Sequence, residues 1–126
     1  LIIVLWSMKK NKGLFTLSQK IIDIFFQDLD NSLRELGVSD LSVGKKIKIL
    51  AENFFGRLAS YTDSIEKSIN DKKSNCLLQS IKKNFNCLEE SKIKYKKIHF
   101  YAVNNINSFK NINEDKILNV CFEFSK

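Results

Sequence analysis

The chain has 126 residues, 44% of them hydrophobic and ten of them phenylalanine, which supports one folded domain and argues against disorder. The net charge is +7, but nearly all of the basic residues are lysine, and arginine occurs only at Arg34 and Arg57. Arginine is the usual residue for bidentate phosphate contacts, so its scarcity argues against a nucleic-acid-binding function. The positive net charge still favours a partner that carries negative charge.

The first predicted helix is a short apolar stub. The run LIIVLW is far shorter than the ~20 apolar residues that span a bilayer, and it lacks the basic leader and cleavage site of a signal peptide. We predict a helix over residues 1–10, followed by Gly13 as the residue after its C-terminus. Because the chain opens with Leu1 inside this helix, we expect an N-terminally truncated domain.

The second predicted helix extends from Thr16 to Leu36. Its apolar residues recur at helical spacing, and Thr16 with Gln19 fits a capping box at its start. Gly37 suits the left-handed residue that ends a helix, and the absence of proline leaves the interior uninterrupted.

The third predicted helix has the strongest periodicity. One apolar stripe continues over 27 residues, formed by Val43, Ile47, Leu50, Phe54, Leu58, Tyr61, Ile65 and Ile69. Ser42 or Asp40 would cap its start. Gly56 lies in its middle, where a glycine is less favourable than alanine by roughly 1 kcal/mol. Such a glycine favours the close approach of another helix, so we predict a crossing there.

Three shorter helices complete the prediction. After a polar break at residues 70–75, apolar spacing predicts a fourth helix from Leu77 to Leu88, a fifth from Glu89 to Phe109 and a sixth from Glu114 to Val120. The run KIKYKKIHFY alternates weakly, as a strand would, but we favour helix. The chain is therefore predicted to be a single all-α domain over residues 1–126, a bundle of about five or six helices with crossed packing.

The sequence contains no arrangement that would support catalysis. Cys76, Cys87 and Cys121 lack CxxC spacing and form no usual zinc set with the lone His99, so we expect reduced, mostly buried thiols. The carboxylates of the second helix have no accompanying nucleophile, calcium loop or glycine-rich phosphate loop. We therefore predict a protein that is not an enzyme, with no catalytic residue, cofactor, metal or small-molecule substrate.

Charged residues gather around the turn between the second and third helices. Arg34 and Glu35 precede this turn, and Asp40 follows it before three lysines. One interpretation is helix capping, since an acidic side chain favours the positive end of a helix. The lysines near that end are unfavourable by a few tenths of a kcal/mol each. This favours a partner with acidic side chains, RNA phosphates or anionic lipid headgroups.

Adjacent phenylalanines form a second unusual pattern. Phe25 and Phe26, like Phe54 and Phe55, cannot both face one narrow apolar stripe, so one of each pair must meet another helix or be exposed. We expect most of these rings, together with Trp6, in the core. An exposed aromatic patch would suit a protein that holds an apolar partner.

The segment DLDNSLRELGVSDLSVGKKIKILAENFFGRLASY, residues 28–61, resembles the central signature of the ubiquinol-cytochrome c chaperone family. The matching positions are Asp28, Asp30, Leu33, Arg34, Glu35, Gly37, Val38, Asp40, Val43, Gly44, Lys45, Lys46, Lys48, Phe54, Gly56 and Arg57. The chain departs at Phe55, where tyrosine is usual. The run LLQSIKKNF, Tyr101 and the closing FEF extend the resemblance more loosely. The first part of the family domain has no counterpart here, and we expect its loss to expose the packing face of the first helix.

This resemblance implies a non-enzymatic assembly chaperone of respiratory complex III that binds newly made cytochrome b and promotes assembly of ubiquinol-cytochrome c reductase. It implies a cytoplasmic protein, peripheral at the inner membrane and on the matrix side in mitochondria, with contact to the ribosome or the membrane surface. Combined with the charges at the turn, it assigns partner binding to Asp30, Arg34, Asp40, Lys45, Lys46, Lys48, Phe55 and Arg57. The residues alone leave an alternative open, a basic helical module that binds ribosomal RNA or an anionic membrane.

Overall fold

The computed structural model is entirely helical in its regular structure over the residues that it describes, which are 1–9, 11–71, 74–84 and 92–125. The elements in chain order are α1 (Ile2–Met8), the 3-10 helix η1 (Lys12–Leu14), α2 (Phe15–Glu35), α3 (Asp40–Asn70), α4 (Cys76–Asn84), α5 (Lys92–Phe109) and α6 (Glu114–Leu118). The all-α prediction is confirmed, including helix for the run KIKYKKIHFY. The predicted end of the fourth helix and start of the fifth, with Phe85, Cys87 and Leu88, lie outside the described residues.

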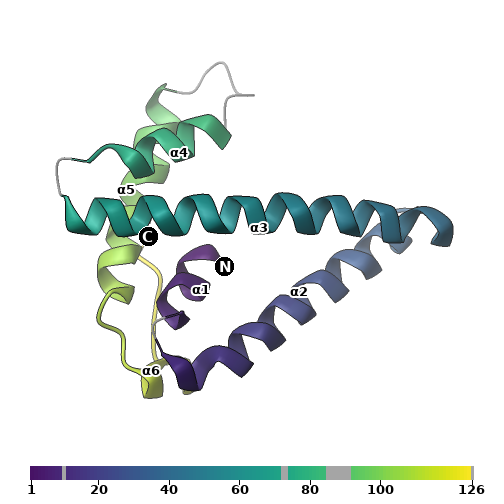
Figure 1. Ribbon diagram of the computed structural model, residues 1–126, viewed down its shortest axis with the longest axis horizontal. Coiled ribbons are helices and arrows are strands. Elements are labelled where there is room, and N and C mark those ends of the chain that lie inside the picture. The colour runs from purple at the N-terminus through teal and green to yellow at the C-terminus, as the bar shows by residue number, and fades with distance from the viewer. Residues whose placement is uncertain (10, 72–73, 85–91, 126) are drawn as a thin grey trace.

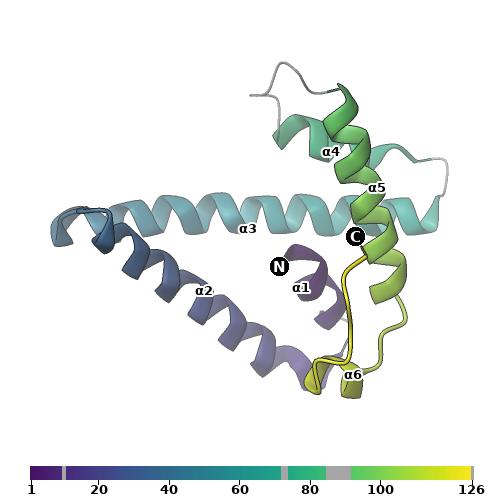
Figure 2. The ribbon, with the colours of Figure 1, turned by 180° about the vertical axis from the view of Figure 1, so that it is seen from behind.

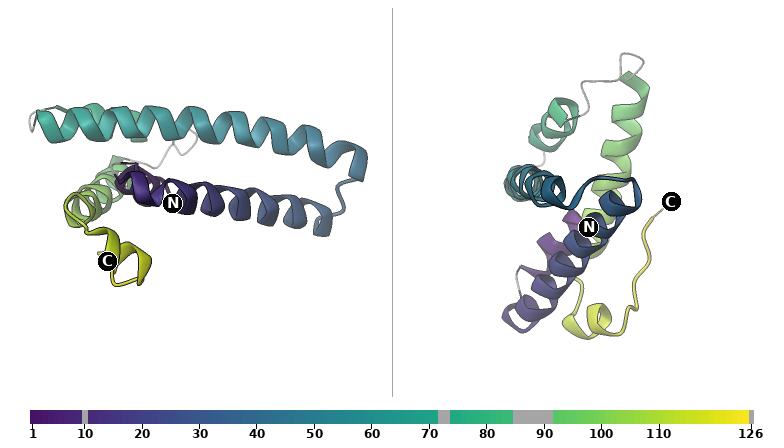
Figure 3. Two further views of the ribbon diagram at one scale, coloured as in Figure 1. Left: turned by 60° about the horizontal axis from the view of Figure 1, so that its bottom comes forward. Right: turned by 90° about the vertical axis from the view of Figure 1, so that its right-hand side faces the viewer.

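α2 and α3 form a helical hairpin that is closed at its turn and open at its other end (Figure 1). α1 lies in this opening, and α4 packs on the opposite side of α3 (Figures 1 and 2). α5 lies near the C-terminal end of α3 and contacts both α4 and α1. From below, the two hairpin helices run almost antiparallel, so they diverge mainly in one plane (Figure 3). The predicted crossed packing of helices is confirmed.

The hairpin turn is a Schellman motif built on Gly37. Its φ of 81° is in the left-handed region, which L side chains rarely adopt. The N–H of Val38 donates to the carbonyl of Leu33 at 3.0 Å, and the N–H of Gly37 donates to the carbonyl of Arg34 at 2.9 Å. These two bonds satisfy carbonyls that the end of α2 would otherwise leave open, so the predicted role of Gly37 is confirmed.

Three of the predicted boundary signals are wrong. α2 begins at Phe15 without a side-chain cap, and Gln19 donates to the carboxylate of Asp23 at 2.9 Å instead of closing a capping box. The capping position of α3 is Ser39, neither Ser42 nor Asp40, and it makes no side-chain capping bond. Gly13 lies inside η1, not in a left-handed position after α1. A side chain at that position would collide with the carboxylate of Glu114.

The main core lies at the end of the molecule away from the hairpin turn. Trp6 of α1, Ile65 of α3 and Phe109 of α5 are each at most 2% exposed there. The remaining buried members are Leu77, Ile81, Tyr95 and Ile106. Four helices thus meet around one apolar cluster, which is how short helices that are marginal alone gain their stability.

A second cluster and the C-terminal tail close the lower side of this core. Met8, Leu14 and Ile117 join α1, η1 and α6 in the small cluster. The ring centroid of Phe109 lies 5.1 Å from that of Phe122 and 5.2 Å from that of Phe124.

Asn105 fastens the tail to α5. It is fully buried, its amide donates to the carbonyl of Tyr101 at 2.8 Å, and its carbonyl accepts the N–H of Ser125 at 2.9 Å. A buried asparagine with both ends bonded fixes the path of the tail.

The hairpin is thin by comparison. None of the residues of α2 is buried, and Val43 is the buried residue that α3 contributes close to the turn. The predicted crossing at Gly56 is wrong, because no atom of another helix among the described residues lies within 4 Å of where its Cβ would be. The helices that cover α3 beyond α2 contact its C-terminal half, so the glycine faces open space.

The cysteine prediction is partly wrong. Cys76 and Cys121 are both free thiols, but Cys121 is exposed and Cys76 is half-buried, whereas we expected mostly buried side chains. Cys87 lies outside the described residues. Among the helices that the structure describes, none has both the length and the apolar character to cross a bilayer.

Candidate functional site

The four adjacent phenylalanines form one cluster where the hairpin helices come together. Phe25 and Phe26 of α2 contact Phe54 of α3 with ring centroids 5.2 and 5.5 Å apart. Phe55 lies 5.4 Å from Phe54 and 6.0 Å from Phe26. Each such pair contributes roughly 0.5–1.5 kcal/mol beyond its buried area. The cluster holds the hairpin together, but Phe25, Phe26 and Phe54 are only half-buried and Phe55 is 47% exposed. The expectation that most of these rings are core is therefore wrong, and it holds only for Trp6.

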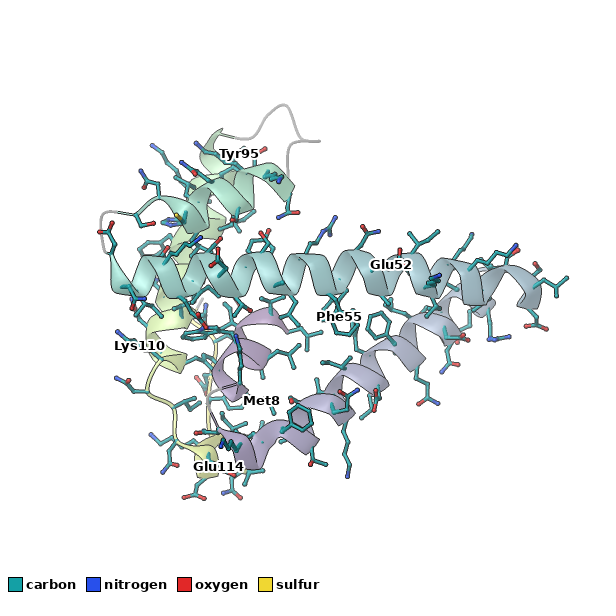
Figure 4. The ribbon with its side chains drawn as sticks, viewed as in Figure 1. Met8, Glu52, Phe55, Tyr95, Lys110 and Glu114 are labelled. Atoms are coloured by element: carbon teal, nitrogen blue, oxygen red, sulfur yellow. The ribbon has the colours of Figure 1, made fainter. Side chains whose placement is uncertain are left out.

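An apolar cleft opens between α1, α2 and α3. Its volume is about 890 Å³, and Phe55 lies at its boundary, on the side of α3 that faces α2 (Figure 4). Each helix contributes large apolar groups, namely Leu5, Trp6 and Met8 from α1, Phe15 and Ile22 from α2, and Phe55, Leu58 and Ala59 from α3. The cleft exists because α2 diverges from α3 while α1 fills only part of the opening.

The lining of the cleft also includes charges of opposite sign on two of its sides. Lys9 and Lys12 lie on the side of α1 and η1, and Asp63 and Glu66 lie on the side of α3. The ammonium of Lys9 is 3.8 Å from the carboxylate of Glu66, so this pair links α1 to α3. Both groups are about half or more exposed, and such a surface pair contributes at most about 1 kcal/mol. The pair can therefore separate at little cost.

Three of the predicted partner-binding residues come together at the hairpin turn. The guanidinium of Arg34 donates to the carboxylates of Asp30 and Asp40, so it links the end of α2 to the first residue of α3. The hydrogen bond and charge of Asp30, with a smaller contribution from Asp40, raise the pKa of Arg34 above its ordinary value. Two charge-assisted bonds make this arginine a brace of the turn.

The predicted lysines do not join this group. Because α3 begins at Asp40, they lie in its second and third turns, beyond the reach of the helix-end charge. The supposed electrostatic penalty on them is therefore absent. At 100° per residue Lys45 and Lys48 share one side of α3, whereas Lys46 lies with Arg57 on another. All four side chains are exposed.

The sequence interpretation missed the row of α3 that lines the cleft. Phe55, Ala59, Thr62 and Glu66 follow one another at i, i+4, i+7 and i+11 and face the cleft together. This row is offset from the apolar stripe that we identified. Its alanine and threonine carry little hydrophobic signal, but the large ring at one end of a row of small residues was a visible cue.

Two comparisons with known proteins agree with this architecture. The family model described as ubiquinol-cytochrome C chaperone matches residues 1–124. The crystal structure of the Cbp3 homolog from Brucella abortus is similar with a TM-score of 0.78 and 29% sequence identity, covering 98% of this chain and 67% of that chain. No curated protein gives a significant match. Since the family match extends over nearly every residue, the chain belongs to the ubiquinol-cytochrome c chaperone family.

Proposed function

We propose that this protein is an assembly chaperone of ubiquinol-cytochrome c reductase, and that it holds an apolar helical segment of newly made cytochrome b in the cleft between α1, α2 and α3. The observation that carries the proposal is the cleft itself, whose apolar walls are open to solvent. Phe15 is 71% exposed and Phe55 is 47% exposed at its edges. Exposed apolar surface rimmed by polar groups is typical of a partner site. Membership of the ubiquinol-cytochrome c chaperone family supports the proposal that the bound partner is a subunit of that complex.

The volume of the cleft is close to that of two turns of an α-helix. A helix roughly 10 Å across with a pitch of 5.4 Å occupies about 850 Å³ in two turns. The volume of about 890 Å³ between the three helices is of that size. A client helix would pack against Phe55 and Phe15 with one apolar face, as amphipathic helices do in hydrophobic grooves.

The charged residues then have different roles. Arg34 links Asp30 near the end of α2 to Asp40 at the start of α3 and so holds the closed end of the hairpin. Lys48 lies two turns before Phe55 on nearly the same side of α3, a position suited to an acidic group at the end of a bound helix. Lys45, Lys46 and Arg57 would add a more general attraction for acidic client segments.

Site-specific photo-crosslinking tests the proposal. A photoreactive phenylalanine analogue is placed at Phe55, inside the cleft, or at Phe100, which is 65% exposed on α5 and outside it. Both replacements exchange an exposed phenylalanine for an analogue that keeps the aromatic ring, so the two positions are matched in residue type and exposure. In cells that make the complex, we expect cytochrome b to crosslink to position 55 and not to position 100. Cytochrome b at position 100 alone, or at neither position, would reject the cleft as the client site.

A charge reversal tests the lysines separately. Lys45, Lys46 and Lys48 changed together to Glu should keep the fold, since all three are exposed. Recovery of cytochrome b in a pull-down should fall. Unchanged recovery would leave these lysines as a solvated helix surface without affecting the cleft. If ribosomal RNA is recovered in the same eluate without cytochrome b, the alternative function at the ribosome surface is supported.

A further inference from the structure

The positive charge of the chain is concentrated outside the hairpin. Residues 15–70 carry seven basic and eight acidic side chains and are therefore nearly neutral. The segments 74–84 and 92–113, which hold α4 and α5, carry seven lysines and no acidic residue. The net charge of +7 therefore belongs mainly to this end and to the residues before α2.

One face of α5 combines this charge with exposed aromatic rings. Lys96 and Lys97 are exposed, and Phe100 and Tyr101 follow each of them at i+4 with 65% and 43% exposure. The same face continues through exposed Asn107, while the opposite face carries the buried side chains of the main core. Within the described part of the chain, nothing covers this basic aromatic face of α5, which we define as Lys96, Lys97, Phe100 and Tyr101.

We propose that the basic aromatic face of α5 binds an anionic lipid surface. Lysines next to a membrane that contains anionic lipid each add a favourable electrostatic contribution, and no acidic side chain of α5 opposes it. Phenylalanine and tyrosine beside them can enter the headgroup region, as in helices that lie in the plane of the interface. The proposal does not depend on the proposed client site.

Lipid suits this face better than nucleic acid does. Neither α4 nor α5 contains an arginine, the residue that makes bidentate contacts with phosphate. The face is also the outer side of a helix, whereas single-stranded nucleic acid is usually followed by a charged groove with stacking platforms. A membrane presents a flat array of headgroups, which an exposed helix face can contact along its length.

The position of α5 leaves the cleft accessible during such contact. α5 lies at the end of α3 that is remote from the hairpin turn (Figures 1 and 2). It contributes no residue to the lining of the cleft. The protein could therefore be held at a lipid surface while its hairpin and cleft remain open to a second partner.

Vesicle flotation with the full chain tests the proposal. The probes are vesicles of phosphatidylcholine with and without phosphatidylglycerol. The test variant is Lys96→Glu with Lys97→Glu, and the control is Lys20→Glu with Lys116→Glu, which makes the same change in net charge at exposed positions of α2 and α6. We expect binding only to the anionic vesicles, with a loss of about thirtyfold or more in the test variant, since each lysine near such a surface contributes roughly a factor of five.

The outcomes separate charge location from total charge. Equal binding to neutral vesicles would overturn the proposal, as would an equal loss in the two double variants. Tight binding of a single-stranded RNA that fails in the α5 variant, with no vesicle binding, would assign the face to nucleic acid instead. Phe100→Ser supplies an independent check, because it keeps the charge and should weaken the binding that survives at high salt. Crosslinking at Phe55 should be unaffected in detergent extracts, so failure here is distinguishable from failure of the client site.

Discussion

The hairpin and the core end of this molecule are built on opposite principles. The core end buries Trp6, Ile65 and Phe109 almost completely, whereas α2 buries none of its residues. The hairpin is nearly neutral with paired charges at its turn, whereas α4 and α5 carry only positive charge. The buried core that stabilises the fold therefore lies apart from the hairpin that forms two walls of the proposed client site. This separation lets the hairpin keep apolar side chains exposed without endangering the fold.

The sharpest test of this contrast is a pair of truncations. Trp6→Ala removes a ring that is 1% exposed, so we expect a loss of about 3–5 kcal/mol in the free energy of unfolding. Phe15→Ala in the hairpin, where the ring is 71% exposed, should change it by less than about 0.5 kcal/mol. Urea unfolding should be followed by circular dichroism, because Trp6 is the only tryptophan. Similar losses in the two variants would contradict the division.

Removing the side chain of Asn105, which fastens the C-terminal tail to α5, should give the next largest loss of stability. Asn105→Ala leaves the N–H of Ser125 without its partner, at a cost of about 1–3 kcal/mol, whereas the carbonyl of Tyr101 keeps the backbone N–H of residue 105 within α5. The released tail should also be cut faster by protease at low concentration. Asn107→Ala on the exposed side of the same helix is the matched control and should leave both measurements unchanged. A tail that stays resistant in the first variant would show that Phe122 and Phe124 hold it without Asn105.

Two helix ends offer an exchange experiment. α6 ends in the same hydrogen-bond pattern as α2, with the N–H of Cys121 on the carbonyl of Lys116, but its left-handed residue is Val120 with φ of 54°. A β-branched residue there is strained by about 1–2 kcal/mol, so Val120→Gly should stabilise the protein by about that amount. Gly37→Val should destabilise the hairpin turn by a similar amount. Thermal melts that shift in the same direction for both variants would contradict this account.

The smallest expected effect is a pH dependence located on α5. Burial lowers the pKa of His99 below its ordinary value of about 6.5. Between the two pKa values the unfolded chain binds the proton and the folded protein does not, so the free energy of unfolding falls as the pH drops below about 6.5. Above that pH the contribution of neutral His99 to stability is fully present. His99→Gln should flatten this part of the stability curve between about pH 5 and 7. An identical slope in the variant would assign the pH dependence to another group.

The sequence was sufficient where a structural element depends on its own residues. The apolar stripe of α3 and the left-handed Gly37 are local properties, and both predictions are confirmed. The crossing at Gly56 failed because periodicity tells which side of a helix is apolar but not which segment a neighbour covers. The capping box failed because η1 continues directly into α2 and leaves Thr16 no free position.

For the candidate site, the sequence supplied components but not their grouping. Phe55, which the sequence assigned to partner binding, is exposed, and Arg34, Asp30 and Asp40 meet at the turn, while their role in binding stays a prediction. The cleft itself depends on the angle between α2 and α3 and on the placement of α1, which no local pattern encodes. The charge difference between the hairpin and α4–α5 is present in the sequence, but the prediction of a partner site was based on the charges at the turn alone.

The absence of buried side chains in α2 also bears on how the protein moves. Segments with few buried contacts open at free energies well below that of global unfolding, as independent cooperative units. α2 is held by the phenylalanine cluster, by the bonds of Arg34 and by its junction with η1. Leu17 and Ile21 also pack against the small cluster of Met8, Leu14 and Ile117. We therefore expect α2 to open and close as a unit at a lower free energy than the unfolding of the core. A bound helix could thus be released when α2 moves away from α3, without unfolding of the core.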